Sequence, residues 1–252
     1  MRPTCSARSN SLNRACVFTV ETGAWPLALK RRGFLANPRL RFLNLPPATA
    51  VSQTQKKLSS PPYLKIIPRR LSTYSPTMAD SSFQFITLGA ILQSFRVKGI
   101  NIVQGFPTQD LYVKHNDPYF GETIGRVANR IKDAKLTSLN GGQTYSLAAN
   151  NGAHNLHGGV VGWGKREWNG PVHVGVRSIP GVEGLKGGES VEFTITSEDG
   201  DEGFPGEVKA KVIYTAGTQT VDGKEVTVLG IEYEAKLVSG AEETPINMTN
   251  HS

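Results

Sequence analysis

Residues 229–237 read LGIEYEAKL and alternate between apolar and polar or small side chains. The apolar set would face one way, and it comprises Leu229, Ile231, Tyr233, Ala235 and Leu237. Because successive side chains of a strand point to opposite faces, this period predicts a strand with one buried face, as in an antiparallel sheet. Residues 191–197, VEFTITS, repeat the pattern with Val191, Phe193 and Ile195 on the apolar face. The sequence therefore predicts an all-β fold.

The flanking segments extend the same prediction. Short apolar runs start at Phe83–Ala90, and residues 136–149, LTSLNGGQTYSLAA, predict a hairpin. Its centre, Asn140–Gly142, supplies the positive φ angles that tight turns require. One stretch hints at a helix: in residues 122–131, ETIGRVANRI, four apolar side chains share a helical face, so we expect a single short helix or a turn. The body as a whole predicts an antiparallel β-sandwich.

Charge divides the chain into two segments. Residues 1–79 hold thirteen Lys/Arg and one acid, a net charge of +12, whereas residues 80–252 hold fifteen bases and twenty acids, a net charge of −5. The first segment is rich in Arg, Ser, Thr and Pro, which is typical of an organellar transit peptide, and equally of an upstream extension outside the true reading frame with Met78 as the start. We expect this leader to be largely disordered. The expected location is the cytoplasm, or mitochondria if the leader is a genuine transit peptide.

Composition excludes several function classes. The basic charge belongs to the leader rather than to the body, so we expect no nucleic-acid partner. No apolar stretch has the length that spans a bilayer, so we expect no membrane partner. Both cysteines, Cys5 and Cys16, lie in the leader, which removes disulfides, thiolate metal sites and a cysteine nucleophile from the body.

Two histidines stand in suggestive surroundings. His157 precedes two glycines, which let the backbone approach a ligand closely, and His251 follows an apolar-polar alternation near a predicted strand end. A side chain that titrates near neutral pH suits general acid/base chemistry. Each histidine taken alone, however, is better explained as a surface or hydrogen-bonded core residue. Spacing alone does not bring the two together.

Other motifs are weaker. The Asn129-Arg130 pair offers donors for sugar or carboxylate oxygens, although a solvated arginine is the simpler interpretation. Residues 199–203, DGDEG, fail the EF-hand pattern and predict a strand-joining turn. Residues 159–165 spell GxxxxGK, but Arg166 replaces the Ser/Thr that a phosphate loop requires. Trp163 and Trp168 suit either sugar stacking or a sandwich core, and tryptophans in a sandwich usually belong to the core.

Four motifs occur in a recognisable order: FGETIGRVANRI, NNGAHNLHGGVVGWGKREW, SEDGDEGFPGEV and TPINMTNHS. Together they resemble the aldose 1-epimerase (galactose mutarotase) family over about residues 83–252. The resemblance implies a galactose-mutarotase-like β-supersandwich that interconverts the α and β anomers of free hexoses. It implies that His251 is the general acid, that His157 binds and polarises the aldose, and that Asn129, Arg130 and Ser252 bind substrate. It implies no metal and no cofactor.

The resemblance also implies something that is missing. The family's base is a glutamate downstream of the His-Ser motif, and no glutamate here matches it. We therefore expect a C-terminally truncated chain, with residues 80–252 as the N-terminal part of the domain, poorly folded and inactive by itself. The alternatives are a non-catalytic carbohydrate-binding module on the same fold, a glycoside hydrolase, which needs two carboxylates across a cleft, and a nucleic-acid-binding protein, which only the leader supports.

Overall fold

The computed structural model describes residues 4–7, 14–21 and 83–252. Its strands are β1 (Thr4–Ala7), β2 (Arg14–Glu21), β3 (Phe83–Ile86), β4 (Ile91–Val97), β5 (Ile100–Asn101), β6 (Thr123–Ile124), β7 (Lys135–Leu139), β8 (Gln143–Ser146), β9 (Asn169–Val176), β10 (Lys186–Ser197), β11 (Glu207–Val221), β12 (Lys224–Ser239) and β13 (Thr249–Asn250). Its helices are α1 (Gln109–His115) and three 3₁₀ turns, Lys132–Ala134, Trp163–Lys165 and Asp201–Gly203. Among these residues no helix is long and apolar enough to cross a membrane.

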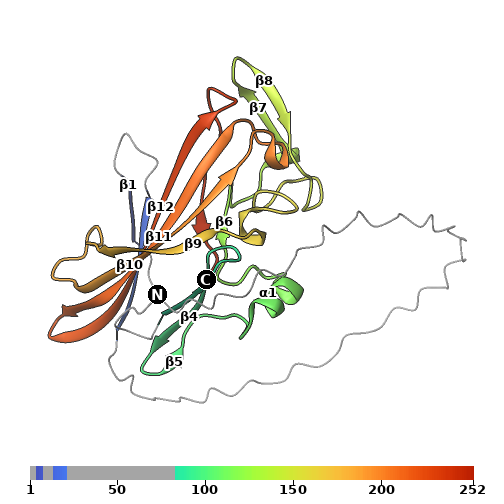
Figure 1. Cartoon of the computed structure of the whole chain (residues 1–252). Helices are drawn as coiled ribbons and strands as arrows, with labels where there is room; N and C mark the ends of the chain where they lie inside the picture. The colour runs from blue at the N-terminus through green and yellow to red at the C-terminus, as the bar shows by residue number, and fades with distance from the viewer. Residues whose placement is uncertain (1–3, 8–13, 22–82) are drawn as a thin grey trace, which may run out of the picture. The chain divides into compact units, whose positions relative to one another are not determined.

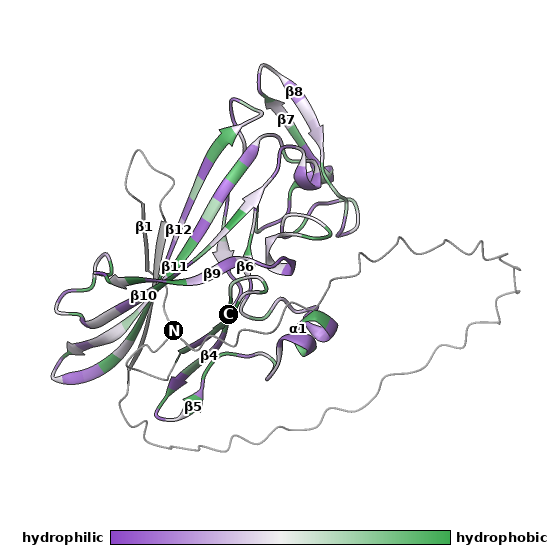
Figure 2. Ribbon diagram, in the orientation of Figure 1, coloured by the Kyte–Doolittle hydropathy of each residue, from purple (hydrophilic) through white to green (hydrophobic). Residues whose placement is uncertain are grey.

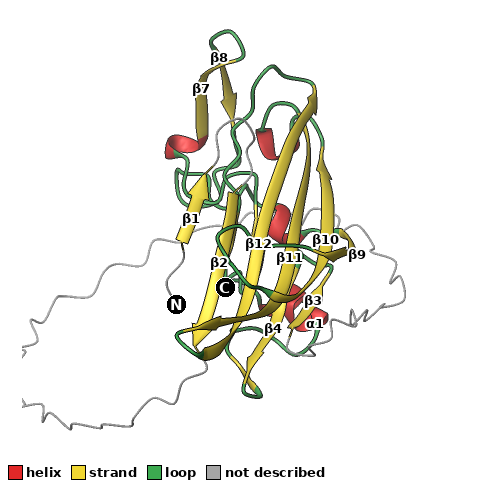
Figure 3. Cartoon of the chain, turned by 90° about the vertical axis from the view of Figure 1, so that its left-hand side faces the viewer, coloured by secondary structure: helices red, strands yellow, loops and turns green. Residues whose placement is uncertain are grey.

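Long antiparallel strands form the main sheet of the described residues. Its order is β1-β2-β12-β11-β10-β9, and β11 and β12 pair from Glu207↔Ser239 to Val221↔Lys224 (Figures 1 and 3). The two strands β1 and β2 lie in the segment assigned to the leader, where the sequence analysis predicts no element. The rest of residues 1–79, including Met78, lies outside the described residues. The antiparallel, all-β class predicted from the sequence is confirmed.

The predicted apolar-polar alternation in β10 and β12 matches the side chains that are buried in the core. Val191 and Phe193 are fully buried, and Leu229, Ile231 and Tyr233 are 1–4% exposed, whereas Glu234 and Lys236 face solvent. Figure 2 shows the resulting change of hydropathy from residue to residue along β10, β11 and β12. Burying such a face contributes about 25 cal/mol per Å² of apolar surface, which makes it the main term that holds the sheet in place.

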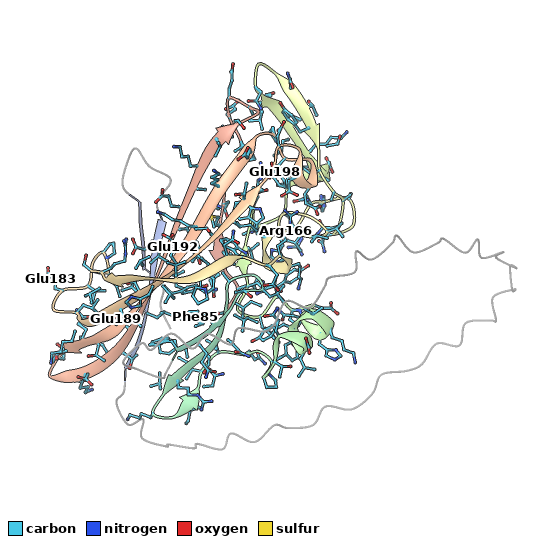
Figure 4. All side chains as sticks on the ribbon, in the orientation of Figure 1. Phe85, Arg166, Glu183, Glu189, Glu192 and Glu198 are labelled. Carbon is cyan, nitrogen blue, oxygen red and sulfur yellow. The ribbon has the colours of Figure 1, made fainter. Side chains whose placement is uncertain are left out.

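A second layer covers this apolar face. Strands β3, β4 and β5 form a separate antiparallel sheet. The Phe85 ring lies 4.4 Å from Tyr214 and 6.2 Å from Phe193, measured between ring centroids (Figure 4 labels Phe85). Phe83, Leu92 and Phe95 belong to the same core cluster. The body is therefore layered sheet on sheet, as predicted.

Two local predictions have different outcomes. The hairpin is confirmed: β7 and β8 pair across Asn140, Gly141 and Gly142, which have φ values of 48°, 79° and 93°. The prediction of a single short helix or a turn over residues 122–131 is wrong, because the structure has neither a helix nor a hydrogen-bonded turn there. That stretch is extended, because its main-chain N–H groups bond to other segments, with Thr123 donating to Gly89 and Ala128 to Asn247.

Arg126 explains why the helix does not form. Its guanidinium is 1% exposed and donates five hydrogen bonds to a set of acceptors near the end of β10 and in the loops beyond: Ser197 Oγ, Ser197 O, Glu198 O, Pro205 O and Thr244 Oγ1. On an amphipathic helix this side chain would face water instead. The helix that the structure does contain, α1, lies in a stretch for which the sequence analysis makes no prediction.

Candidate active site

The structure brings the two histidines together. His157 and His251 are 94 positions apart in the sequence, yet their ring centroids lie 5.2 Å apart with the ring planes at 89°. The imidazole of His157 is partly buried and that of His251 is exposed. Two titratable groups thus face one small volume, as acid/base chemistry on a bound molecule requires.

The His157 loop is fixed by close backbone packing. His157 has a φ of 55°, and Gly158 and Gly159 have φ values of 82° and 126°. A Cβ at Gly158 would lie 1.9 Å from the carbonyl oxygen of Gly125, so only glycine fits. The glycines therefore serve contact between two protein segments, where the sequence analysis expected an approach to a ligand.

A carboxylate holds the next residues of this loop. Glu202 accepts hydrogen bonds from the main-chain N–H groups of Val160 and Val161, at 2.9 Å and 2.8 Å. Glu202 comes from the acidic loop 199–203, which joins β10 to β11 as the predicted strand-joining turn. In the same loop Asp201 forms a bidentate ion pair with Arg166 (Figure 4 labels Arg166).

One hydrogen bond settles the tautomer of His157. Its Nδ1 lies 2.6 Å from the carbonyl oxygen of Ala128, and a carbonyl can only accept, so Nδ1 carries the proton and Nε2 keeps its lone pair. Burial lowers the pKa of His157; the Ala128 carbonyl opposes this, and the nearby positive charges of His251, Arg130 and Lys165 lower the pKa further. The imidazole is therefore neutral at pH 7 and can accept a hydrogen bond at Nε2.

His251 is positioned by its main chain. Its N–H donates to the carbonyl of Glu122 at 2.9 Å, and its carbonyl accepts from Gly121 at 3.1 Å. The preceding strand β13 pairs with β6 through Thr249↔Ile124. These contacts place the imidazole beside His157 and leave both of its ring nitrogens without a hydrogen-bonding role in the contacts described.

The Asn129-Arg130 pair lies next to His157. Ala128, the residue before the pair, accepts hydrogen bonds from both the main-chain N–H and Nδ1 of His157. Arg130 donates from Nε to Asn151 Oδ1 at 2.8 Å, and both members of the pair are exposed. The substrate-binding role expected for Asn129 and Arg130 stays a prediction.

Ser252 lies beside a separate cavity. The cavity has a volume of about 380 Å³ and is bordered by Asn250, Ser252 and a mostly apolar set from β4, β5, the segment after it and β12: Leu92, Phe95, Asn101, Ile102, Val103, Gln104, Leu229 and Ile231. None of the other residues predicted for the site lines it. The substrate-binding role expected for Ser252 thus stays a prediction.

Sequence reasoning missed three residues behind the histidines. The Tyr119 ring lies 4.6 Å from His157 and 5.8 Å from His251, centroid to centroid. Lys165 Nζ lies over the Tyr119 ring, 4.3 Å from its centroid, and forms an ion pair with Glu122 at 2.6 Å. In the sequence, Lys165 belongs to the GxxxxGK stretch that fails the phosphate-loop pattern. No periodicity marks Tyr119 or Glu122.

The tryptophans take the simpler of their two roles. Trp163 is 1% and Trp168 is 3% exposed, and the indole N–H of Trp168 donates to the carbonyl of Trp163. They belong to the core and are not available for stacking on a sugar.

Comparison with known proteins identifies the family of the chain. The family model for aldose 1-epimerase matches residues 74–252. Galactose mutarotase of Bos taurus is 40% identical over 172 residues, covering 66% of this chain and 42% of that protein, and the Homo sapiens galactose mutarotase is 38% identical over the same shares.

A solved structure, that of the GalM/aldose epimerase homologue from C. elegans, is 31% identical, with a TM-score of 0.48, over 67% of this chain and 45% of that one. The chain spans less than half the length of these relatives. The resemblance carried by the four motifs is confirmed, and the chain belongs to the aldose 1-epimerase family.

Proposed function

We propose that this chain carries the proton-donating and sugar-holding part of a site that interconverts the α and β anomers of free hexoses such as glucose and galactose. The observation that carries the proposal is the 5.2 Å approach of His157 and His251 in a chain of this family. Mutarotation opens the pyranose ring, rotates the C1–C2 bond and recloses the ring on the other face. Opening needs a proton at the ring oxygen and removal of one from the C1 hydroxyl.

Four of the five predicted residues have a role in this reaction. His251, with an exposed imidazole, delivers the proton to the ring oxygen, while His157 polarises the sugar through Nε2. Arg130 and Asn129 hold hydroxyl groups, so that proton transfer is in line. When an acid and a base act together in such a step, each contributes a factor of about 10² to 10⁴.

The base is the open part of the proposal. The groups whose electrostatic effect shifts the pKa of His157, namely His251, Arg130 and Lys165, are all basic side chains. Of the nearby carboxylates, Glu122 is buried against Lys165 and Glu202 is bonded to Val160 and Val161. We therefore propose that the carboxylate that accepts the C1 hydroxyl proton is supplied from outside the described residues. The chain by itself should bind aldoses and accelerate mutarotation little.

Polarimetry with freshly dissolved α-D-glucose tests this directly. We expect the purified chain to change the rate by less than tenfold over buffer, and clear turnover that is lost in H251Q would show that a base is present after all. Binding is followed separately through the imidazole ¹⁵N resonances during a titration with galactose. Perturbation of His157 and His251 supports the proposal, whereas no perturbation at either ring contradicts it.

The second candidate is a non-catalytic carbohydrate-binding module on the same fold. The basic side chains around His157 favour it. Sugar binding with no turnover, even after addition of a small carboxylate such as acetate as an external base, is the result expected of such a module. Acetate-dependent turnover that H251Q abolishes is the result expected of the enzyme.

A further inference from the structure

Lys165 connects three groups beneath the histidines. Its Nζ donates to Glu122 Oε1 at 2.6 Å and to the carbonyl oxygen of Asn116, and it lies 4.3 Å from the centroid of the Tyr119 ring. The Lys165 side chain is 31% exposed and that of Glu122 is 1% exposed. The cation is thus held in one place by two oxygens while it contacts an aromatic face, a favourable arrangement.

Tyr119 carries this contact to the site. Its ring packs against His157 at 4.6 Å with an interplanar angle of 65°, and against His251 at 5.8 Å with an angle of 44°. One ring therefore lies close to both imidazoles and to the lysine. A shift of Tyr119 would change the spacing of the histidine pair.

Glu122 belongs to both parts of the arrangement. Its side chain receives hydrogen bonds from Lys165 and from Asn116 Nδ2 at Oε1, while its main-chain carbonyl accepts the N–H of His251. Its other carboxylate oxygen, Oε2, is buried among the described residues without a hydrogen-bond partner. A Cβ at Gly164 would lie 2.1 Å from this oxygen, so a glycine at this position makes room for it.

Burying a carboxylate in this way is costly. Burial raises the pKa of Glu122 to about 7, although the hydrogen bonds from Lys165 and Asn116 and the charge of Lys165 pull it down. A buried ion pair is a weak source of stability, because desolvation offsets the attraction. Its location behind two histidines points to a role in the site.

We propose that Lys165, anchored by Glu122, is a positioning residue of the histidine site: it holds Tyr119 across both imidazoles and places a fixed positive charge behind His157. This inference rests on the proposed function, since it assigns a task to residues behind that site. Neither Lys165 nor Glu122 touches the sugar in the proposed reaction.

Distance sets the size of the expected effect. The centroid distances of 4.3 Å and 4.6 Å limit the separation of Lys165 Nζ from the His157 ring to 8.9 Å. A unit charge at that distance moves a pKa by about 0.3 pH unit in a water-like medium and by about 1.4 at an effective dielectric constant of about 20. The other groups acting on His157 are His251, Arg130 and the Ala128 carbonyl, and none of them is altered in the test below.

The test measures the pKa of His157 by ¹⁵N NMR in the sugar-free chain. K165M keeps the side-chain length and removes the charge, so the pKa of His157 should rise by about 0.3 to 1.4 pH units. K165R should keep it near the wild-type value. E122Q removes the carboxyl group that anchors the lysine. Because the pKa of Glu122 is about 7, this group is largely neutral where His157 titrates, so the pKa of His157 should change by less than in K165M. The matched control is K209M, at an exposed lysine on β11, which should leave it unchanged.

Two lysine variants separate this role from a structural one. Loss of packing alone would move K165R and K165M together, and that result would overturn the proposal. So would a K165M value equal to that of K209M. If K165M fails to fold, as judged by the fluorescence of Trp163 and Trp168, K165Q takes its place: a rise in the His157 pKa supports the proposal and no change or a fall refutes it.

A failure of the proposed function would give a different result from a failure of the positioning role. If galactose perturbs neither imidazole while K165M shifts the His157 pKa as expected, the sugar site is wrong and the positioning pair stands. If galactose binds and K165M leaves the His157 pKa unchanged, the sugar site stands and the positioning pair is wrong.

Discussion

Replacement of Arg126 by methionine should be among the most destabilising single changes in the body. The guanidinium donates five hydrogen bonds, three of them to the main-chain carbonyls of Ser197, Glu198 and Pro205. Burial lowers the pKa of Arg126 to about 10, against the opposing charges of Asp201 and Asp199, so the side chain is still charged at pH 7. R126M keeps much of the volume and removes every donor.

The magnitude follows from the acceptors left behind. The bonds to the Ser197 and Pro205 carbonyls are buried, and an orphaned buried acceptor costs about 1 to 3 kcal/mol. Two of them give about 4 kcal/mol, which agrees with the roughly 3 to 5 kcal/mol for breaking one side of a buried charged contact. With a urea m-value of about 2 kcal/mol/M, the midpoint falls by about 2 M. If the free energy of unfolding of the wild type is below about 4 kcal/mol, R126M is unfolded in buffer.

Urea denaturation followed by Trp163 and Trp168 fluorescence checks the prediction. R126K retains the charge and some of the donors and should lose about half as much, and R96M, at an exposed arginine, should change stability by less than about 0.5 kcal/mol. A loss below about 1 kcal/mol for R126M would refute the reasoning. It would mean that water or neighbouring groups satisfy the carbonyls.

Three further predictions concern the loops around the site. Burial opposes ionisation of Asp201, but hydrogen bonds from Arg166 and Ser197 outweigh it and hold the pKa of Asp201 below the ordinary value. The stability that the ionised Asp201 contributes is therefore present above about pH 4 and is lost as the pH falls through the folded-state pKa. The urea midpoint should decline less between pH 5 and pH 3 in D201N than in wild type, and equal declines would contradict this. E202A removes the acceptor of the Val160 and Val161 N–H groups, so amide hydrogen exchange at both residues should speed up at least tenfold, with E202Q intermediate. Unchanged exchange would show that the hydrogen bonds to Glu202 do not hold the Val160–Val161 segment in place. G164A would place a methyl group against Glu122 Oε2, and should shift the His251 resonances and lower the urea midpoint, whereas G141A, in an open hairpin turn, should leave those resonances in place.

The fold was predictable where local pattern and tertiary structure agree. In VEFTITS and LGIEYEAKL the period of two coincides with burial against β3 and β4, so the faces could be read directly. The hairpin at Asn140–Gly142 was predictable because positive φ angles select those residues. The four-motif resemblance then identified the family, and it implied the roles that are proposed for His157 and His251.

Other features depend on contacts between segments distant in the sequence. Residues 122–131 have a helical period, but the buried hydrogen bonds of Arg126 override it, and no local signal announces a buried arginine. Tyr119, Glu122 and Lys165 act through each other, and their spacing of three and forty-three positions follows no secondary-structure period. Nothing in the spacing of the histidines predicted their 5.2 Å contact, and only the family resemblance implied that both belong to one site.

The two-residue ladder between β6 and β13 has a consequence for folding kinetics. It joins Ile124 to Thr249, 125 positions apart, and it brings His251 to the segment that holds Glu122. Contacts between such distant positions form slowly, because the entropy of closing a long loop is lost before any contact compensates for it. The hairpins β7–β8 and β10–β11 can form before this ladder. The contact between the two imidazoles therefore reports the closure of this long-range ladder, and a ¹⁵N-labelled histidine pair can serve as the probe of that step.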